Sequence, residues 1–106
     1  MLSEFLVESE TITPGVLMLR VVGELDAATA DHLVQTLEQW AGISECVIDL
    51  SNCTFVDSRG LTALLMCRRV IGESTPMRLI DPLPNVEHVL RIAGLQTYLG
   101  LDVPAA

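Results

Sequence analysis

Basic and aromatic residues are scarce in this chain of 106 residues. It contains no lysine, so its six basic residues are all arginines, against 14 acidic residues and a net charge of −8. Nucleic acids and anionic membrane surfaces are bound through clustered Lys and Arg, and Arg68-Arg69 is the only adjacent basic pair. We therefore expect no binding to either. Because only 4% of the residues are aromatic, the core is expected to be aliphatic.

Signals for export, membrane insertion and disulfide bonding are also missing. The segment 1–5 has no basic stretch before an apolar run, and no apolar run approaches the ~18 residues of a membrane span. Cys46, Cys53 and Cys67 form no C-x-x-C pair and lie in apolar surroundings. The sequence predicts three buried, reduced thiols in a cytoplasmic protein without direct membrane insertion.

Patterns for cofactor binding, metal binding and covalent catalysis are absent as well. No GxGxxG or GxxxxGK(S/T) motif occurs, and His32 and His88 lack the spacing of metal ligands. Ser58 falls at a strand–loop–helix junction, where some hydrolases place a nucleophile. However, no glycine precedes Ser58 at the spacing of a GxSxG elbow, and both histidines are predicted on exposed helix faces. We therefore expect a non-catalytic protein without a cofactor or metal.

Apolar residues are abundant enough for one hydrophobic core. They make up 50% of the chain, and the mean hydropathy is +0.47. We expect a single domain over 1–106, with 96–106 as its tail. The alternation of apolar runs with amphipathic stretches predicts the α/β class, with a mixed β-sheet flanked by α-helices. The expected strands lie at 3–8, 16–22, 46–50 and 76–80, and the expected helices at 26–42, 59–72 and 84–93, followed by a short helix or strand around 95–101.

Several boundaries of these elements rest on local signals. The apolar run 16–22 is interrupted only by Arg20, which predicts a strand buried on both faces. The turn signal Thr13-Pro14-Gly15 predicts that this strand forms a hairpin with the one before it. Asp26 is the expected N-cap of the first helix, and Pro84 fits the first turn of the third.

The middle of the chain leads from a strand into the second helix. The segment 51–56 is expected to be a loop. The second helix has apolar residues nearly all round, so its first two turns are expected to be the most buried helix in the fold. One face carries Ala63, Met66, Cys67, Val70 and Ile71, with Leu61, Leu64 and Leu65 beside them.

The turn Asp57-Ser58-Arg59-Gly60, called the Asp57 turn below, begins this second helix. Asp57 and Ser58 can each cap the free amides there, which on its own makes them local architecture. The turn can also be a docking surface and phosphorylation site, because a phosphate at a helix N-terminus meets the amides and the positive end of the dipole. Such a phosphate would repel an acidic partner. The residues alone leave both interpretations open.

Three stretches of the chain resemble the STAS family and, more narrowly, the bacterial anti-sigma factor antagonists. They are Gly23-Glu24-Leu25-Asp26-Ala27-Ala28-Thr29-Ala30, Val47-Ile48-Asp49-Leu50-Ser51 and Phe55-Val56-Asp57-Ser58-Arg59-Gly60-Leu61. The resemblance implies a mixed sheet flanked by helices and no catalytic activity. It also implies binding to an anti-sigma factor that is a serine kinase, which frees a sigma factor. The kinase then phosphorylates the second residue after the motif Asp, and a phosphatase resets the cycle.

This chain departs from the family pattern at the acceptor position. Arg59 stands where the family has its acceptor hydroxyl, and Ser58 matches the preceding serine. The departure leaves three outcomes: a constitutive antagonist, a domain switched at Ser58 or elsewhere, or a member with different partners. The resemblance implies that a protein partner is bound through Glu24, Asp26, Asp57, Ser58, Arg59 and Gly60.

Two other functions remain open from the sequence. In the first, the domain senses a nucleotide and Arg59 supplies a cation for its phosphate. In the second, it is a soluble coupling subunit of a transport assembly. A homodimer formed along the first strand as an exposed edge also stays open.

Overall fold

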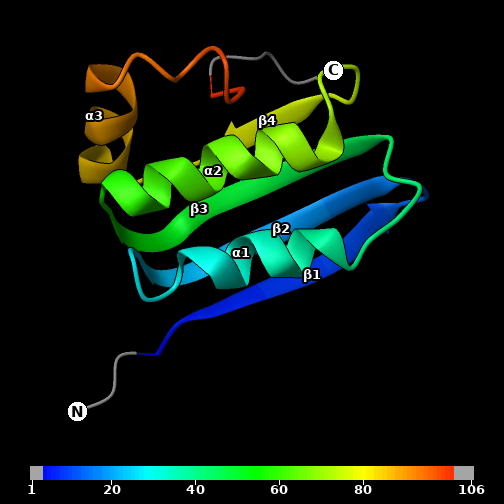
Figure 1. Cartoon of the computed structure of the whole chain (residues 1–106), viewed down its shortest axis with the longest axis horizontal. Helices are drawn as coiled ribbons and strands as arrows, with labels where there is room; N and C mark the ends of the chain where they lie inside the picture. The colour runs from blue at the N-terminus through cyan, green and yellow to red at the C-terminus, as the bar shows by residue number, and fades with distance from the viewer. Residues whose placement is uncertain (1–3, 102–106) are drawn as a thin grey trace.

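The computed structural model describes residues 4–101 and contains seven regular elements in the order ββαβαβα. Figure 1 shows a four-stranded sheet with helices packed against it. The α/β prediction with a mixed sheet is confirmed. The elements are β1 (Leu6–Thr13), β2 (Val16–Leu25), α1 (Ala30–Glu38), β3 (Glu45–Val56), α2 (Ser58–Ile71), β4 (Met77–Ile80) and α3 (Pro84–Ile92).

The first two strands form the predicted hairpin at one edge of the sheet. β1 pairs antiparallel with β2, and Thr13 lies opposite Val16 across the turn. β1 was expected at 3–8, but it continues to Thr13 because its whole length pairs with β2. Residue 3 lies outside the described part of the chain. β1 is an edge strand, and the homodimer along it stays a prediction.

The remaining strands pair in parallel through helical crossovers. The sheet order is β1-β2-β3-β4, and β2–β3 and β3–β4 are both parallel. Both crossovers advance in the same direction across the sheet, so right-handed connections place α1 and α2 on one face. Figure 1 shows these two helices side by side and running in the same direction. The carboxyl ends of β2 and β3 therefore meet the start of α2. We call this end of the sheet its carboxyl edge, to distinguish it from the outer strand β1.

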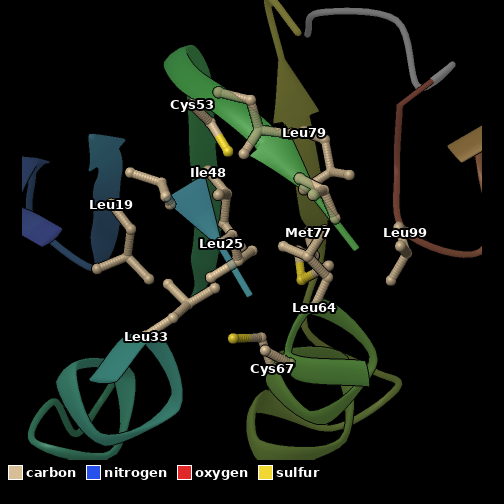
Figure 2. Packing of buried hydrophobic residues seen from close by; sticks show 14 of the residues in the cluster. Leu19, Leu25, Leu33, Ile48, Cys53, Leu64, Cys67, Met77, Leu79 and Leu99 are labelled. Atoms are coloured by element: carbon tan, nitrogen blue, oxygen red, sulfur yellow. The ribbon is translucent and has the colours of Figure 1, made fainter. Parts of the chain in front are cut away.

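One face of the sheet and the two helices enclose an aliphatic core. The buried side chains of β2 are Leu17, Leu19, Val21 and Leu25, whereas the residues that alternate with the first three are only half-buried. The prediction that β2 is buried on both faces was wrong, because no helix in the described part of the chain, residues 4–101, covers the second face. Figure 2 shows Leu33 of α1 and Leu64 of α2 pointing toward the strands. The three cysteines are buried and free, as predicted.

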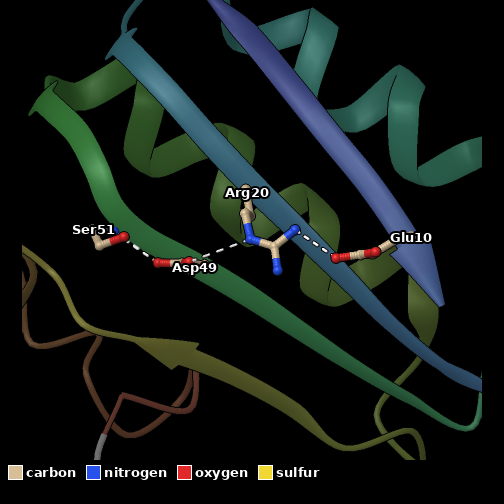
Figure 3. A network of polar contacts seen from close by, with 4 residues as sticks. All are labelled: Glu10, Arg20, Asp49 and Ser51. Atoms are coloured by element: carbon tan, nitrogen blue, oxygen red, sulfur yellow. Dashed lines mark hydrogen bonds and ion pairs between the residues drawn. The ribbon is translucent and has the colours of Figure 1, made fainter. Parts of the chain in front are cut away.

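The second face of the sheet carries charged residues in place of a core. Arg20 interrupts the apolar run of β2 on this face, where its Nη1 lies 2.6 Å from Glu10 Oε1. Its Nε lies 3.8 Å from Asp49 Oδ2, and the Ser51 amide donates to Asp49 Oδ1 at 2.9 Å. Figure 3 shows this network across β1, β2 and β3. Ion pairs of this kind suit a face in contact with water.

Two expected features near the middle of the chain are corrected. The segment 51–56 is strand, not loop, because β3 extends to Val56 and stays paired with β2 up to its last residue. On α2, Met66 and Val70 are 39% and 42% exposed. The stripe of α2 that is buried consists of Gly60, Ala63, Leu64, Cys67 and Arg68.

After α3, the described chain contains no further helix or strand but still packs against the core. Pro84 occupies the first turn of α3, as predicted. Residues 95–101 form turns, so the expected short helix or strand is not present there. Leu99 is fully buried, and the Leu79 amide donates to the Gly100 carbonyl at 3.1 Å. Residues 102–106 lie outside the described residues. Between residues 4 and 101, no helix is long and apolar enough to cross a membrane.

Candidate functional site

The ends of β2 and β3 bring the two candidate segments together. In the parallel register, Glu24 lies beside Phe55 and Leu25 beside Val56. The Asp57 amide then donates to the Leu25 carbonyl at 3.3 Å. The Asp57 turn therefore lies directly against the segment that contains Glu24 and Asp26, although about 30 residues separate them in the sequence.

Asp57 is the N-cap of α2, as the sequence indicates. Its backbone is extended (φ −102°, ψ −170°), and its Oδ1 accepts from the amides of Arg59 and Gly60, each at 2.9 Å. The side chain of Ser58 forms no hydrogen bond with any residue in 4–101, and it is exposed. Asp57 alone therefore caps the helix, and Ser58 is left exposed to solvent.

Gly60 allows the start of α2 to approach the end of β2. It is buried, and a Cβ atom at this position would overlap the Leu25 carbonyl oxygen and lie 3.0 Å from Val56 Cγ1. Any side chain here would push α2 away from β2. The glycine of the Asp57 turn is therefore a requirement of packing.

Asp26 does not cap α1, which corrects the prediction. The helix begins four residues later at Ala30, with Thr29 as its N-cap residue. Asp26 instead holds the turn before the helix, because its Oδ1 accepts from the Ala28 amide at 3.0 Å. Thr29 Oγ1 accepts from the Asp26 amide at 2.9 Å and donates to the Glu24 carbonyl at 2.7 Å. These bonds fix the shape of the segment that faces the Asp57 turn.

Arg59 is exposed and forms no ion pair with any residue between 4 and 101. Arg20, Arg78 and Arg91 each pair with a carboxylate. Within the described residues, Arg59 forms no side-chain hydrogen bond or ion pair. It also stands in the first turn of α2, where the positive end of the helix dipole disfavours a cation. Its side chain is thus available to an anionic group outside the chain.

Two residues at this edge were missed by the sequence prediction. Phe55 is 44% exposed beside Glu24, and Asn85 of α3 donates from Nδ2 to the Thr54 carbonyl at 2.9 Å. Strand alternation could have found Phe55, because Val56 points inward and its neighbour must point outward. Because 51–56 was expected to be a loop, this alternation was not applied to Phe55. Nothing in the sequence points to the contact of Asn85.

No catalytic group is paired with Ser58 in residues 4–101. The ring of His32 packs edge-on against Phe5, with 5.6 Å between ring centroids. His88 lies on the exposed side of α3, as predicted. Neither histidine forms a hydrogen bond with Ser58 that would prepare the hydroxyl as a nucleophile.

The fold and this site define a two-layer α/β domain with a polar turn where two parallel strands end and a capped helix begins. The model of the STAS domain family matches residues 9–103. The chain belongs to the STAS domain family.

Named relatives include an anti-sigma F factor antagonist from Paenibacillus polymyxa, which is 33% identical over 85 residues, covering 76% of this chain and 73% of the relative. The structure of an anti-sigma factor antagonist from Mycobacterium paratuberculosis has a TM-score of 0.79 at 27% identity, over 90% of this chain and 82% of that one. A sulfate transporter family protein from Wolinella succinogenes has a TM-score of 0.73 at 17% identity, over 86% of this chain and 76% of that one. That last likeness shows the fold alone.

Proposed function

We propose that the chain is a non-catalytic, cytoplasmic regulator that binds an anti-sigma factor of the serine-kinase type and thereby frees a sigma factor. The contact surface consists of the Asp57 turn together with Glu24 and Asp26. The observation that carries the proposal is the direct contact of these segments, which the hydrogen bond from the Asp57 amide to the Leu25 carbonyl holds together. Arg59 is exposed beside this contact and forms no ion pair within residues 4–101. The similarity to two anti-sigma factor antagonists supports it.

Arg59 determines how such a regulator would be controlled. An arginine has no hydroxyl to accept a phosphate, so the usual acceptor position cannot be modified. We propose that the antagonist is constitutive with respect to this position. Ser58 stays the candidate acceptor one residue earlier, because its hydroxyl is exposed and unpaired within residues 4–101. A phosphatase has a role only if Ser58 is phosphorylated.

Calorimetric titration against each kinase-type anti-sigma factor of the same cell tests the proposal. Wild type is expected to bind one of them, and Asp57→Ala to bind it more weakly because the turn loses its cap. The Paenibacillus polymyxa antagonist with its own anti-sigma factor is the positive control. If none of the anti-sigma factors binds while the control does, the proposal is wrong.

Mass spectrometry after incubation with the binding kinase and ATP tests the second part. Residue 59 is expected to stay unmodified in wild type and to be phosphorylated in Arg59→Ser. Stoichiometric phosphate on Ser58 of wild type would show that switching survives one position earlier.

The nucleotide-sensing alternative has less support from the structure. The hollow beside Arg59 has a volume of about 160 Å³, whereas small-molecule sites typically have about 300–1,000 Å³. For the coupling-subunit alternative, the only support is a fold-level likeness to the transporter protein.

A further inference from the structure

The sheet face that no helix of residues 4–101 covers has apolar side chains close to the carboxyl edge. β1 begins at this end of the sheet, because it runs antiparallel to β2 and Leu6 lies beside Val22. Figure 1 shows the start of β1 on the same side of the molecule as the start of α2. Phe55 lies beside Glu24, two residues further along β2 than Val22. We call Leu6, Val22 and Phe55 the open-face patch.

The β1 and β2 members of this patch point away from the core. Phe5 and Val7 pack against the core, so Leu6 between them points to the other face of the sheet. Val22 is paired with Leu6 and therefore points to the same face. Leu6 is 41% exposed, because nothing on this face of the described chain covers it.

Phe55 brings the open-face patch to the Asp57 turn. Its neighbour Val56 is buried in the core, whereas Phe55 is 44% exposed and lies two residues before Asp57. The end of β3 that carries it is held in place, because Asn85 of α3 donates to the Thr54 carbonyl at 2.9 Å. Exposed apolar side chains that gather beside a candidate contact surface are typical of a region that a partner covers.

Glu24 adds a negative charge that the chain does not compensate. It is exposed, and its carboxylate forms no ion pair or hydrogen bond within residues 4–101. Arg20, the basic residue of β2, already binds Glu10 at 2.6 Å. Arg59 lines the hollow between α1 and α2, which cover the opposite face of the sheet. A basic group beside Glu24 therefore has to come from a partner.

We infer that the open-face patch is the apolar part of the partner-binding surface, where the anti-sigma factor packs apolar side chains on Leu6 and Phe55 and places a basic side chain against Glu24. This inference rests on the proposed function and extends its contact surface from the Asp57 turn onto the open face of the sheet. Continuity with the turn selects the same partner, and the charge of Glu24 selects a basic group. Apolar anchors surrounded by polar groups are the usual arrangement of such interfaces.

Calorimetric titration with the anti-sigma factor that binds wild type tests the patch. Phe55→Ala is expected to weaken binding about tenfold or more, and Leu6→Ala about fivefold or more. Circular dichroism and thermal melting first show that each variant is folded. If Phe55→Ala does not fold, Phe55→Thr replaces it, because threonine suits a strand.

Each substitution has a matched control elsewhere on the surface. Ile12→Ala is the control for Leu6→Ala, since Ile12 is 48% exposed at the opposite end of the same strand. Tyr98→Ala is the control for Phe55→Ala. Tyr98 is 45% exposed and lies beside Arg68 of the last turn of α2, at the far end of that helix from the Asp57 turn. Both controls are expected to bind within about twofold of wild type.

The basic group of the partner is tested by charge reversal. Glu24→Lys is expected to weaken binding about tenfold, and a basic-to-Glu substitution in the anti-sigma factor is expected to restore it. If no such substitution restores binding, the assignment of a basic group is wrong.

The outcomes separate this inference from the proposed function. If Asp57→Ala weakens binding but Phe55→Ala or Leu6→Ala binds like wild type, the inference is wrong and the proposed function stands. Losses of equal size in the two controls would also overturn the inference. If wild type binds no anti-sigma factor, both are wrong.

Discussion

At the scale of single residues, Arg59 combines an unfavourable position with an exposed, unpaired side chain. Its cation faces the positive end of α2, where charges of that sign are disfavoured by about 0.3–1 kcal/mol. Arg69 is the natural comparison, because it lies in the last turn of the same helix, where the dipole favours a cation. A residue that lowers stability at the centre of a candidate contact surface is typical of function rather than folding.

Arg59→Glu is therefore expected to raise the free energy of unfolding by about 0.3–1 kcal/mol, because it replaces a disfavoured charge with a favoured one. Arg69→Glu is expected to lower it by a similar amount. Urea unfolding followed by circular dichroism at low salt measures both. A less stable Arg59→Glu protein would mean that Arg59 has a stabilising partner.

Gly60→Ala is expected to lower the free energy of unfolding by about 1–3 kcal/mol, because the added methyl group overlaps the Leu25 carbonyl. Ser58→Ala, at an exposed position two residues earlier, is the control and should change stability by less than about 0.5 kcal/mol. Chemical denaturation gives both values. Equal stability of Gly60→Ala and wild type would contradict the close packing of α2 on β2.

The roles of single residues were predictable where they depend on nearby backbone. Asp57 as a cap follows from the sequence because the amides it binds are two and three residues away. Asp26 was misassigned because Thr29 forms a competing turn with it. The contact of Asn85 with Thr54 could not be predicted, because it joins residues 31 apart and depends on how α3 packs.

At the scale of elements, α2 depends on its first turn for both position and capping. Two of the amides at its start are satisfied by Asp57 alone, and its buried stripe starts at Gly60. The Asp57 turn is thus a rigid platform, which favours its use as a contact surface.

Asp57→Ala is expected to lower the free energy of unfolding by about 1 kcal/mol, because both amides lose their acceptor. Asp57→Asn keeps an acceptor oxygen and should recover most of the difference. Thermal and urea unfolding of the three proteins provide the comparison. If the Ala and Asn variants were equally stable, the side-chain cap would not be what holds the start of α2.

The order of the elements was predictable, but several of their boundaries and the inward face of α2 were not. Apolar runs and amphipathic periods indicate the sequence ββαβαβα directly. The end of β3 was missed because Ser51, Asn52 and Thr54 are typical of turns, whereas the pairing of Asn52, Cys53, Phe55 and Val56 with β2 keeps this segment in the strand. The inward face of α2 was misjudged because leucines and methionine surround this helix, and only packing selects among them.

At the scale of the whole molecule, three buried thiols belong to an otherwise aliphatic core. Burial raises the pKa of Cys46 and of Cys67 from 9.0 to about 12, and it also raises the pKa of Cys53. The folded state therefore holds these protons more tightly than the unfolded state. This contribution to stability is fully present below pH 9.0 and is lost as the pH rises toward about 12.

We expect the free energy of unfolding to fall between about pH 8 and pH 10, by up to about 1 kcal/mol per pH unit for each thiol above pH 9. The absence of lysine leaves few other groups that titrate there. Urea unfolding at both pH values gives the slope. The Cys46→Ala/Cys67→Ala variant should show a smaller fall, and an equal fall in both proteins would contradict the role of the thiols.

The sequence predicted the α/β class, but it did not predict that one face of the sheet is covered by helices and the other is exposed to water. The sequence indicates a mixed sheet with helices, and the structure adds that α1 and α2 cover the same face. Arg20 was the signal, because a charged residue in an apolar strand marks the face exposed to water. The hollow beside Arg59 depends on the packing of these two helices and could not be predicted from the sequence.

The most direct test of the account is the fate of the complex between this chain and its kinase-type anti-sigma factor when ATP and Mg²⁺ are added. Size-exclusion chromatography with mass spectrometry follows the complex and its phosphate over time. We expect wild type to stay bound and unmodified at residue 59, whereas Arg59→Ser is phosphorylated and released. Failure of wild type to form a complex would contradict the account, and release of wild type with phosphate on Ser58 would contradict constitutive binding and move the switch one position earlier.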